Sequence, residues 1–237
     1  MWFAFIDETS DAKFKNYFGI SLALVNSSFY PGIKHDAQEL LMNKGWDPKI
    51  EFKGSCLFSA TKGCPNVNVE NRIELAADLL NLNVANKNRR MKFYFVRMDS
   101  TNQKRDYLKI LPLLLKKALP HSDKKGDKDL LSVTCDYRSD ISASEFQSVL
   151  DPVLREKNYI LFEQVSTPAS SFQTIGLLYA DIVGYLVARV DNISRDSELF
   201  ENIPKELFED NAKVRKLQSS KDLISLIKQL SLFEVKK

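Results

Sequence analysis

Near its start the chain reads WFAFIDETSD, residues 2–11, an apolar run that turns acidic at Asp7. Residues 2–7 have the composition of a buried β-strand that ends in an acid. A second apolar run, over residues 17–25, follows a short polar segment, and this spacing predicts a β-hairpin. The fold is therefore expected to begin with two adjacent strands, the first of which presents a carboxylate at its end.

Helical and strand-like patterns alternate after this hairpin. Apolar residues at helical spacing predict helices over about 31–43, 69–86, 104–119, 142–157 and 172–190. Short or alternating apolar runs predict further strands over about 91–98, 130–136 and 159–165. Strands interleaved with helices in this order predict an α/β domain with a mixed central sheet. An amphipathic segment over 211–235 is expected to form a C-terminal helix that packs on the core or mediates dimerisation.

Length and composition fit one globular domain. The chain has 237 residues, of which 44% are hydrophobic and 27% charged. We expect a single domain over 1–237, with a core of about 1–190 and a helical extension of about 191–237. The longest apolar run, 174–188, contains Asp181 and is shorter than the roughly 20 residues that a membrane helix needs. The N-terminus lacks the pattern of a signal peptide, so we expect a cytoplasmic protein without membrane contact.

Basic residues are clustered, although the net charge is only +3. Such clusters can bind the phosphates of a nucleic acid without sequence preference, or can simply form a solvated face. The candidate nucleic-acid-binding residues are Lys87, Arg89, Arg90, Lys92, Lys124 and Lys125.

Carboxylates occur in surroundings that are unusual for surface charge. Asp7 and Asp136 each end a predicted strand, and the carboxyl ends of central strands commonly carry ligand sites. Asp181 lies inside an apolar helix, where a buried carboxylate needs a cation, a hydrogen-bond donor or a proton. Glu51 is a further candidate, in a polar segment after a turn. Taken singly, each acid also fits a structural role, such as an ion pair of Asp136 with Arg138.

A set of carboxylates of this kind suits hard divalent cations. Mg²⁺ is typically held by one or two carboxylates together with water and substrate phosphate. Two ions about 3.5–4 Å apart can activate a water and stabilise the leaving oxygen of a phosphodiester. The acids therefore predict a metal-dependent nuclease. Carboxylates more than about 8 Å apart could not share one ion, and that arrangement would favour a binding module instead.

A nucleophilic hydrolase is a weaker interpretation. Only His35 and His121 are available as bases, and neither stands in an informative context. The candidate nucleophiles are Ser55, Cys56 and Cys64. We interpret the three cysteines of the chain as reduced structural residues.

Four segments, taken in order, match the motifs of a known family. They are DETSD at 7–11, EFKGS at 51–55, the acid Asp136, and GLLYAD at 176–181. The first is similar to an Asp-Glu-Ser-Gly-Asp opening, the second to a Glu-x-His/Lys-x-Ser element, and the last to a Gly-Leu-Gln-x-Ala-Asp helix motif. Together they resemble the bacterial and archaeal family called domain of unknown function 3800, which is regarded as ribonuclease-H-like.

This resemblance spans residues 1 to about 190. It implies a ribonuclease-H-like fold, in which a mixed sheet of about five strands is flanked by helices. It also implies two Mg or Mn ions and catalysis by Asp7, Glu51, Asp136 and Asp181. Lys53 is a further candidate catalytic residue, which can position a substrate phosphate or polarise a ligand, or can be a solvated side chain. The chain departs from the family at Ser10, where Gly is usual, and at Leu178, where Gln is usual, and the second change removes a polar neighbour of Asp181.

Two functions follow from the resemblance. The first is hydrolysis of RNA or DNA, in the setting of bacterial genome defence. The second is a non-catalytic accessory subunit that keeps the fold and binds nucleic acid or protein, with the C-terminal helix as a partner or homodimer interface.

Overall fold

A computed structural model describes residues 1–10, 16–46, 53–57, 72–83, 91–122, 128–136, 138–167, 174–200 and 233–234. Its strands are β1 (Trp2–Ser10), β2 (Tyr17–Asn26), β3 (Met91–Asp99), β4 (Asp129–Asp136), β5 (Tyr159–Thr167) and β6 (Phe233–Glu234). Its helices are α1 (Tyr30–Asn43), α2 (Gly54–Leu57), α3 (Arg72–Asn81), α4 (Gln103–Ala118), α5 (Ala143–Lys157) and α6 (Ile175–Phe200).

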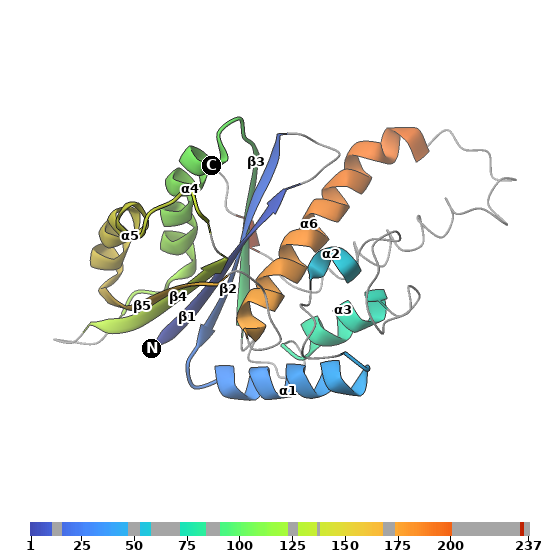
Figure 1. The fold of residues 1–237 in the computed structure, drawn as a ribbon, viewed down its shortest axis with the longest axis horizontal. Coiled ribbons are helices and arrows are strands. Elements are labelled where there is room, and N and C mark those ends of the chain that lie inside the picture. The colour runs from blue at the N-terminus through green and yellow to red at the C-terminus, as the bar shows by residue number, and fades with distance from the viewer. Residues whose placement is uncertain are drawn as a thin grey trace, which may run out of the picture.

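The strands form one mixed sheet in the order β5-β4-β1-β2-β3-β6 (Figure 1). β2 is antiparallel to both β1 and β3, whereas β4 is parallel to β1 and β5 is parallel to β4. β6 pairs in parallel with the outer side of β3. The five longer strands thus have the order 3-2-1-4-5 around a central β1, which confirms the predicted ribonuclease-H-like fold class.

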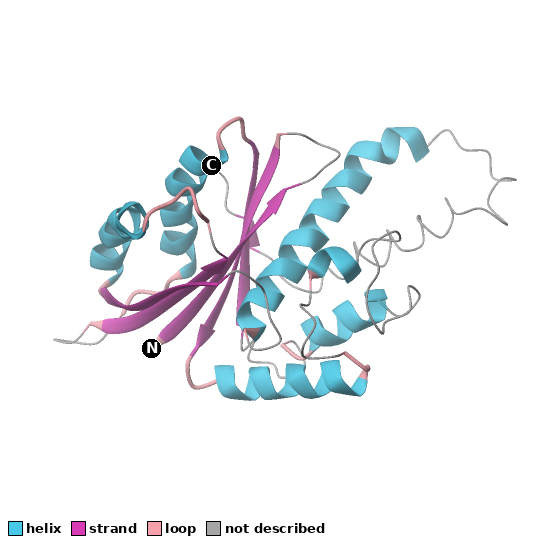
Figure 2. Ribbon diagram, viewed as in Figure 1, coloured by secondary structure: helices cyan, strands magenta, loops and turns pink. Residues whose placement is uncertain are grey.

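Helices cover the two faces of the sheet as separate layers (Figure 2). Side chains alternate between the faces along each strand. Ala4 and Ile6 therefore pack with α4 and α5, while Phe5, between them in sequence, packs with α1, α3 and α6. The sheet is consequently buried on both sides at its centre, and a polar side chain on β1 must find its partners inside the protein.

Helix α6 lies unusually close to β1. A Cβ atom added at Gly176 would lie 2.1 Å from Cδ2 of Phe5, and one added at Gly184 would lie 2.2 Å from Oγ1 of Thr9. Both distances are far shorter than a van der Waals contact, so glycine is required at both positions for this packing. Gly176 and Gly184 thus permit the close approach of α6 to β1.

Several element bounds differ from the predictions. Helix α3 ends at Asn81, whereas the prediction extended to residue 86. β1 does not end at Asp7 but continues to Ser10, because Glu8, Thr9 and Ser10 keep pairing with β2 across the hairpin. α6 starts later than predicted and extends to Phe200. β5 also continues beyond its predicted end, to Thr167.

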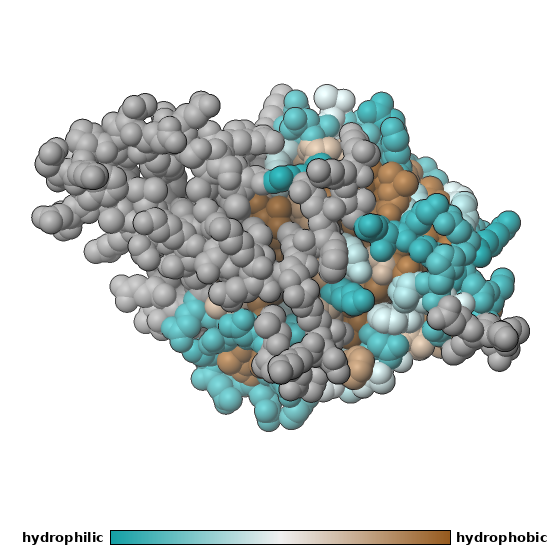
Figure 3. Space-filling model, turned by 180° about the vertical axis from the view of Figure 1, so that it is seen from behind, coloured by the Kyte–Doolittle hydropathy of each residue, from teal (hydrophilic) through white to brown (hydrophobic). Residues whose placement is uncertain are grey.

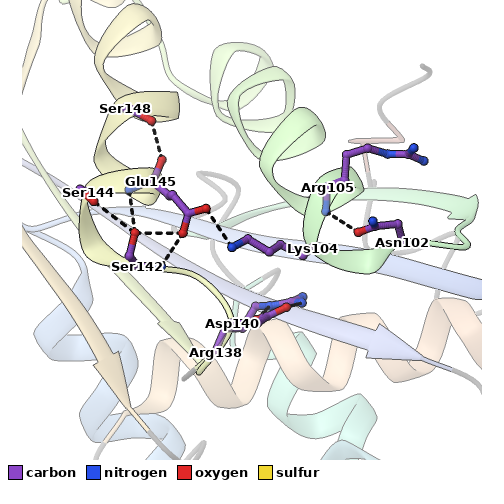
Figure 4. A network of polar contacts seen from close by, with 9 residues as sticks. All are labelled: Asn102, Lys104, Arg105, Arg138, Asp140, Ser142, Ser144, Glu145 and Ser148. Atoms are coloured by element: carbon purple, nitrogen blue, oxygen red, sulfur yellow. Dashed lines mark hydrogen bonds and ion pairs between the residues drawn. The ribbon is translucent and has the colours of Figure 1, made fainter.

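Ser142 caps the N-terminus of α5. The Glu145 backbone N–H donates to Ser142 Oγ at 3.2 Å, and the Glu145 carboxylate accepts from the Ser142 backbone N–H at 2.9 Å. Glu145 Oε1 also lies 2.8 Å from Nζ of Lys104 on α4, so this cap ties α4 to α5 (Figure 4). The interaction holds together the two helices that cover one face of the sheet.

Of the predicted C-terminal helix over 211–235, only Phe233–Glu234 is described. This part of the prediction is wrong, because these residues pair with β3 as strand β6. The proposed division near residue 190 stays a prediction, and α6 runs across it. In the described part, hydrophilic side chains cover much of the surface and hydrophobic ones show in patches between them (Figure 3). No helix among these residues combines the length and apolarity that crossing a membrane requires.

Candidate active site

The parallel pairing of β1 with β4 brings two predicted acids together. The last residue pair of this ladder is Ile6–Cys135, so Asp7 and Asp136 follow it directly on adjacent strands. Cys135 packs on the α4 and α5 side of the sheet, and alternation therefore places both acids on the α6 side. Asp136 ends its strand as predicted, and Asp7 lies where the parallel ladder ends although β1 continues.

Asp181 of α6 lies against Asp7, completing a cluster of acids. Asp7 is 7% exposed and Asp181 is 5% exposed. Burial is the largest cause that raises the pKa of Asp7 well above its usual value, and the negative charges of Asp181 and then Asp136 add to it. Asp7 and Asp181 also share a side-chain hydrogen bond. Like-charged groups held this closely favour binding of a proton or a cation.

The backbone of α2 holds the Asp181 carboxylate. Gly54 N–H donates to Asp181 Oδ2 at 2.5 Å. A Cβ atom at Gly54 would lie 3.0 Å from the Asp181 carbonyl oxygen and 3.1 Å from Cδ2 of Tyr185, so a larger residue would crowd this contact. The structure thus brings the segment that begins at Lys53 beside Asp181, and Lys53 is exposed next to it. Glu51 lies outside the described residues.

Sequence analysis missed Ser21, which contacts the backbone of both β1 and α6 beside this cluster. Ser21 is fully buried on β2 and pairs with Asp7 across the antiparallel ladder. Its Oγ lies 2.8 Å from the carbonyl oxygen of Ala180 and 3.3 Å from that of Asp7. This hydroxyl joins α6 to the sheet at the level of the acids. The available signal was a lone serine within the apolar run 17–25.

A second polar network lies on the opposite face of the sheet, beside the same part of strands β1 and β4. Arg138, which follows β4, donates through Nη1 to the Glu8 carboxylate. It also donates to both carboxylate oxygens of Asp140, at 2.9 Å and 2.7 Å. Burial raises the pKa of Glu8 to about 7, although the Arg138 charge opposes this shift. Arg138 therefore serves Glu8 and Asp140, rather than acting simply as the local partner of Asp136.

The chemistry of the acid cluster fits a hard divalent cation. Asp7 and Asp181 are adjacent buried carboxylates, Asp136 follows in register, and Mg²⁺ commonly needs only one or two carboxylates besides water and phosphate. In the described part of the chain, no group of three or more His, Cys, Asp or Glu side chains is already positioned to hold a metal ion. Asp7 and Asp181 therefore fit as two ligands of a metal site that further ligands complete.

The remaining predicted site residues are distributed differently. Lys92 is exposed on β3, and its alternation with buried Phe93 and Tyr94 puts it on the face opposite the acids. The structure therefore does not bring Lys92 to the acid cluster. The other residues of the predicted basic clusters lie outside the described part, namely Lys87, Arg89, Arg90, Lys124 and Lys125.

The histidines do not support a nucleophilic mechanism. His35 is exposed on α1, where its Nε2 lies 3.4 Å from Glu39 Oε1, and His121 is exposed after α4. Cys135 is a buried thiol, as expected for a structural cysteine. The structure does not describe the side chains of the candidate nucleophiles Ser55, Cys56 and Cys64.

No protein-family model and no curated protein matches this chain. Among solved structures, the chain is similar to one from the PCNA:RNase HII complex of Archaeoglobus fulgidus, with 11% identity, a TM-score of 0.46, and coverage of 95% of this chain and 89% of the other. It is also similar to ribonuclease H2 from Pyrococcus horikoshii OT3, with 12% identity, a TM-score of 0.44, and coverage of 96% and 99%.

A mutant protein of Bst-RNase HIII has 12% identity and a TM-score of 0.45, and the match covers 96% of this chain and 68% of that one. The fold class itself rests on the strand order and directions of the sheet. The domain is thus ribonuclease-H-like, with buried acids at the edge of its central strands.

Proposed function

We propose that the protein is a divalent-metal-dependent nuclease that hydrolyses phosphodiester bonds of RNA or DNA. The observation that carries the proposal is the meeting of Asp7, Asp136 and Asp181 on one face of the sheet. These residues come from β1, β4 and α6, and the first and last are buried. Burying like charges together is costly for folding, so a role in binding a cation is a physical reason for keeping them.

Each residue of the cluster has a distinct part in this function. Asp7 and Asp136 provide strand-borne carboxylates, and Asp181 is aimed by the Gly54 N–H and by the attachment of α6 to the sheet. When bound, Mg or Mn would polarise the phosphate and lower the pKa of the attacking water. Glu51 is proposed as a fourth ligand, and Lys53 as a contact to a substrate phosphate.

Hydrolysis by this cluster would be an in-line displacement at phosphorus. A water oxygen forms the new P–O bond while the bond to the 3′-oxygen breaks, and the leaving oxygen takes up a proton. The products carry a 5′-phosphate and a 3′-hydroxyl. We propose two ions for this reaction, because two ions can serve the attacking and leaving oxygens at once.

The test is cleavage of labelled single- and double-stranded RNA and DNA in Mg²⁺ or Mn²⁺. Asp136→Asn should reduce cleavage by more than the roughly 10–100-fold that loss of an outer-shell partner causes. Asp151→Asn is the matched control, since Asp151 is a half-exposed acid on α5 whose nearest cation, Arg155, is 4.0 Å away. Unchanged metal-dependent cleavage in Asp136→Asn would contradict the proposal.

A non-catalytic accessory subunit is the second candidate. It is favoured by the absence, within the described residues, of a ready group of three metal-binding side chains. Calorimetry with Mg²⁺ and Mn²⁺ on wild type and Asp136→Asn separates the two functions. Binding that the substitution removes favours the nuclease, whereas a folded wild type that neither binds the metals nor cleaves favours the accessory subunit.

Membership in the family called domain of unknown function 3800 remains part of this proposal. It is supported by the order of the four sequence motifs and by the position of Asp7, Asp136 and Asp181 around one site. A role in bacterial genome defence follows from the same resemblance, and it is proposed with it.

A further inference from the structure

The two acids borne by adjacent strands are not paired with each other, although Asp7 pairs with Ser21 on β2 and Asp136 pairs with Thr167 on β5. Within the described residues, the β1–β4 ladder has its last pair at Ile6–Cys135, one step before Asp7 and Asp136. Side chains that bind one metal must keep their separation to within a fraction of an ångström. A side-chain connection between β1 and β4 beyond the last pair of their ladder would help to hold this separation.

Arg138 and Glu8 form such a connection. Glu8 directly follows Asp7, Arg138 stands two residues after Asp136, and the Arg138 Nη1 donates to the Glu8 carboxylate. The contact crosses from the β4 end to the β1 end immediately beyond the acids. It is sheltered, since the side chains of Arg138 and Glu8 are 17% and 23% exposed. A charge-assisted hydrogen bond that is partly withdrawn from water resists separation better than an exposed one.

The guanidinium is itself fixed on its remaining sides. Its Nε and Nη2 bind the two oxygens of Asp140 at 2.9 Å and 2.7 Å, as a fork binds a carboxylate. Its carbon lies 5.2 Å from the ring centroid of Tyr107 on α4. Figure 4 shows Arg138 and Asp140 side by side below the capped end of α5. Arg138 therefore has a fixed position relative to α4 and to the loop that follows β4.

The geometry points to Arg138 as a positioning residue. From the opposite face of the sheet, it sets the distance between Asp7 and Asp136. Tyr107, which it overlies, belongs to the α4 and α5 layer, whereas the acids lie on the α6 side. Three of its donors are already engaged and it lies behind the sheet, so a direct contact with substrate is not its role. The inference rests on the proposed function, because the separation matters through a shared ligand of the acids.

The experiment compares Arg138→Met, Arg138→Lys and Glu8→Gln with wild type. Arg155→Met is the matched control, since Arg155 is 80% exposed on α5 and its ion pair with Asp151 is long, at 4.0 Å. One readout is Mn²⁺ affinity by calorimetry. The other is amide hydrogen exchange at Asp7 and Asp136, with Val25 as an internal reference in the core.

We expect Arg138→Met to weaken Mn²⁺ binding by about 10–100-fold, as loss of an outer-shell partner does. Amide exchange should accelerate at Asp7 and Asp136 but not at Val25. Arg138→Lys should recover only part of the affinity, because an ammonium cannot reproduce the fork to Asp140 and the bond to Glu8. Arg138→Met and Glu8→Gln combined should cost less than the sum of the two, since both remove one interaction.

Two results would overturn the inference. In the first, exchange at Asp7 and Asp136 is the same in Arg138→Met as in Arg155→Met. In the second, exchange accelerates but Mn²⁺ affinity is unchanged, which makes Arg138 merely structural. A folded wild type that does not bind Mn²⁺ and does not cleave contradicts the proposed function instead, and it removes the positioning role along with it.

Discussion

The two faces of this sheet differ in what surrounds their acidic side chains. On the α6 face, Asp7 and Asp181 are buried together, and each raises the cost of ionising the other. On the α4 and α5 face, the carboxylates of Glu8, Asp140 and Glu145 are matched with Arg138 and Lys104. The difference teaches that the fold can pair its charges where only stability is at stake. The face on which Asp7 and Asp181 are buried together is therefore the one to examine for function.

The largest effect on the contrast between the two faces is expected from displacing α6, which carries Asp181. Gly184→Ala would place a Cβ atom 2.2 Å from Thr9 Oγ1, so α6 must shift away from β1 and carry Asp181 with it. Overpacking of this kind costs about 1–3 kcal/mol. We expect a lower thermal midpoint, measured by circular dichroism, and weaker Mn²⁺ binding, measured by calorimetry.

Gly45→Ala is the control for this substitution. Gly45 has a φ of +80° and nothing within 4 Å of its added Cβ atom, so it tests a backbone cost of about 1 kcal/mol without a clash. Stability should fall moderately while Mn²⁺ affinity is kept. Equal metal affinity in Gly184→Ala and wild type would show that Asp181 does not depend on this packing.

The next test neutralises the charge of the α6 face. Because the folded pKa of Asp7 is raised above its usual 3.8, the stability linked to its protonation is fully present below that value and is lost as pH rises through the folded pKa. Asp7→Asn removes this loss. Without metal, the variant should therefore melt above wild type at neutral pH, and the gap should shrink as pH falls toward 4.

For a chain of this size, each 1 kcal/mol gained corresponds to about 2–4 °C in thermal midpoint. Calorimetric melts between pH 4 and 8 in the presence of a chelator measure the effect. The same substitution should abolish cleavage, so stability and activity move in opposite directions. A variant that melts below wild type throughout would mean that Asp7 stabilises the fold, and the contrast between the faces would disappear.

The smallest effect is expected on the matched face. Lys104 and the Ser142 backbone lower the pKa of Glu145 from 4.5 to about 2. A lowered folded pKa contributes stability above the unfolded value, and this contribution is lost as pH falls from about 4.5 toward 2. Glu145→Gln should thus be slightly less stable than wild type at pH 7 and equal to it near pH 2.

Urea unfolding at both pH values measures this difference, and Glu39→Gln, at an exposed position of α1, is the control. Metal affinity at pH 7 should be unaffected by either substitution. A loss of Mn²⁺ binding in Glu145→Gln would show that the cap between α4 and α5 communicates with the acids across the sheet.

The sequence predicted the elements of this fold well because each depends on local periodicity. The alternating pattern of 91–98 and the helical spacing of 104–119 correspond closely to β3 and α4. Asp181 was also recognisable, since a carboxylate among apolar residues at helical spacing implies unusual surroundings. These signals are contained within a single element, so no knowledge of pairing was needed.

Contacts between distant elements could not be predicted in the same way. The amide of Gly54 reaches Asp181 only because α2 packs on α6, and Arg138 reaches Glu8 only because β4 lies parallel to β1. The strand order that creates both neighbourhoods is a property of the whole sheet. Asp7 shows the same limit, because its predicted strand end is the end of one ladder and not of the strand.

The central position of β1 has a consequence for synthesis of the chain on the ribosome. β1 is the first strand to be made, yet its parallel partner β4 and the helix α6 that brings Asp181 are made much later. An N-terminal fragment that ends before α6 holds Asp7 without Asp181. The cluster of acids therefore forms only after most of the polypeptide has emerged, and a nascent nuclease of this design would stay inactive while its own message is being read.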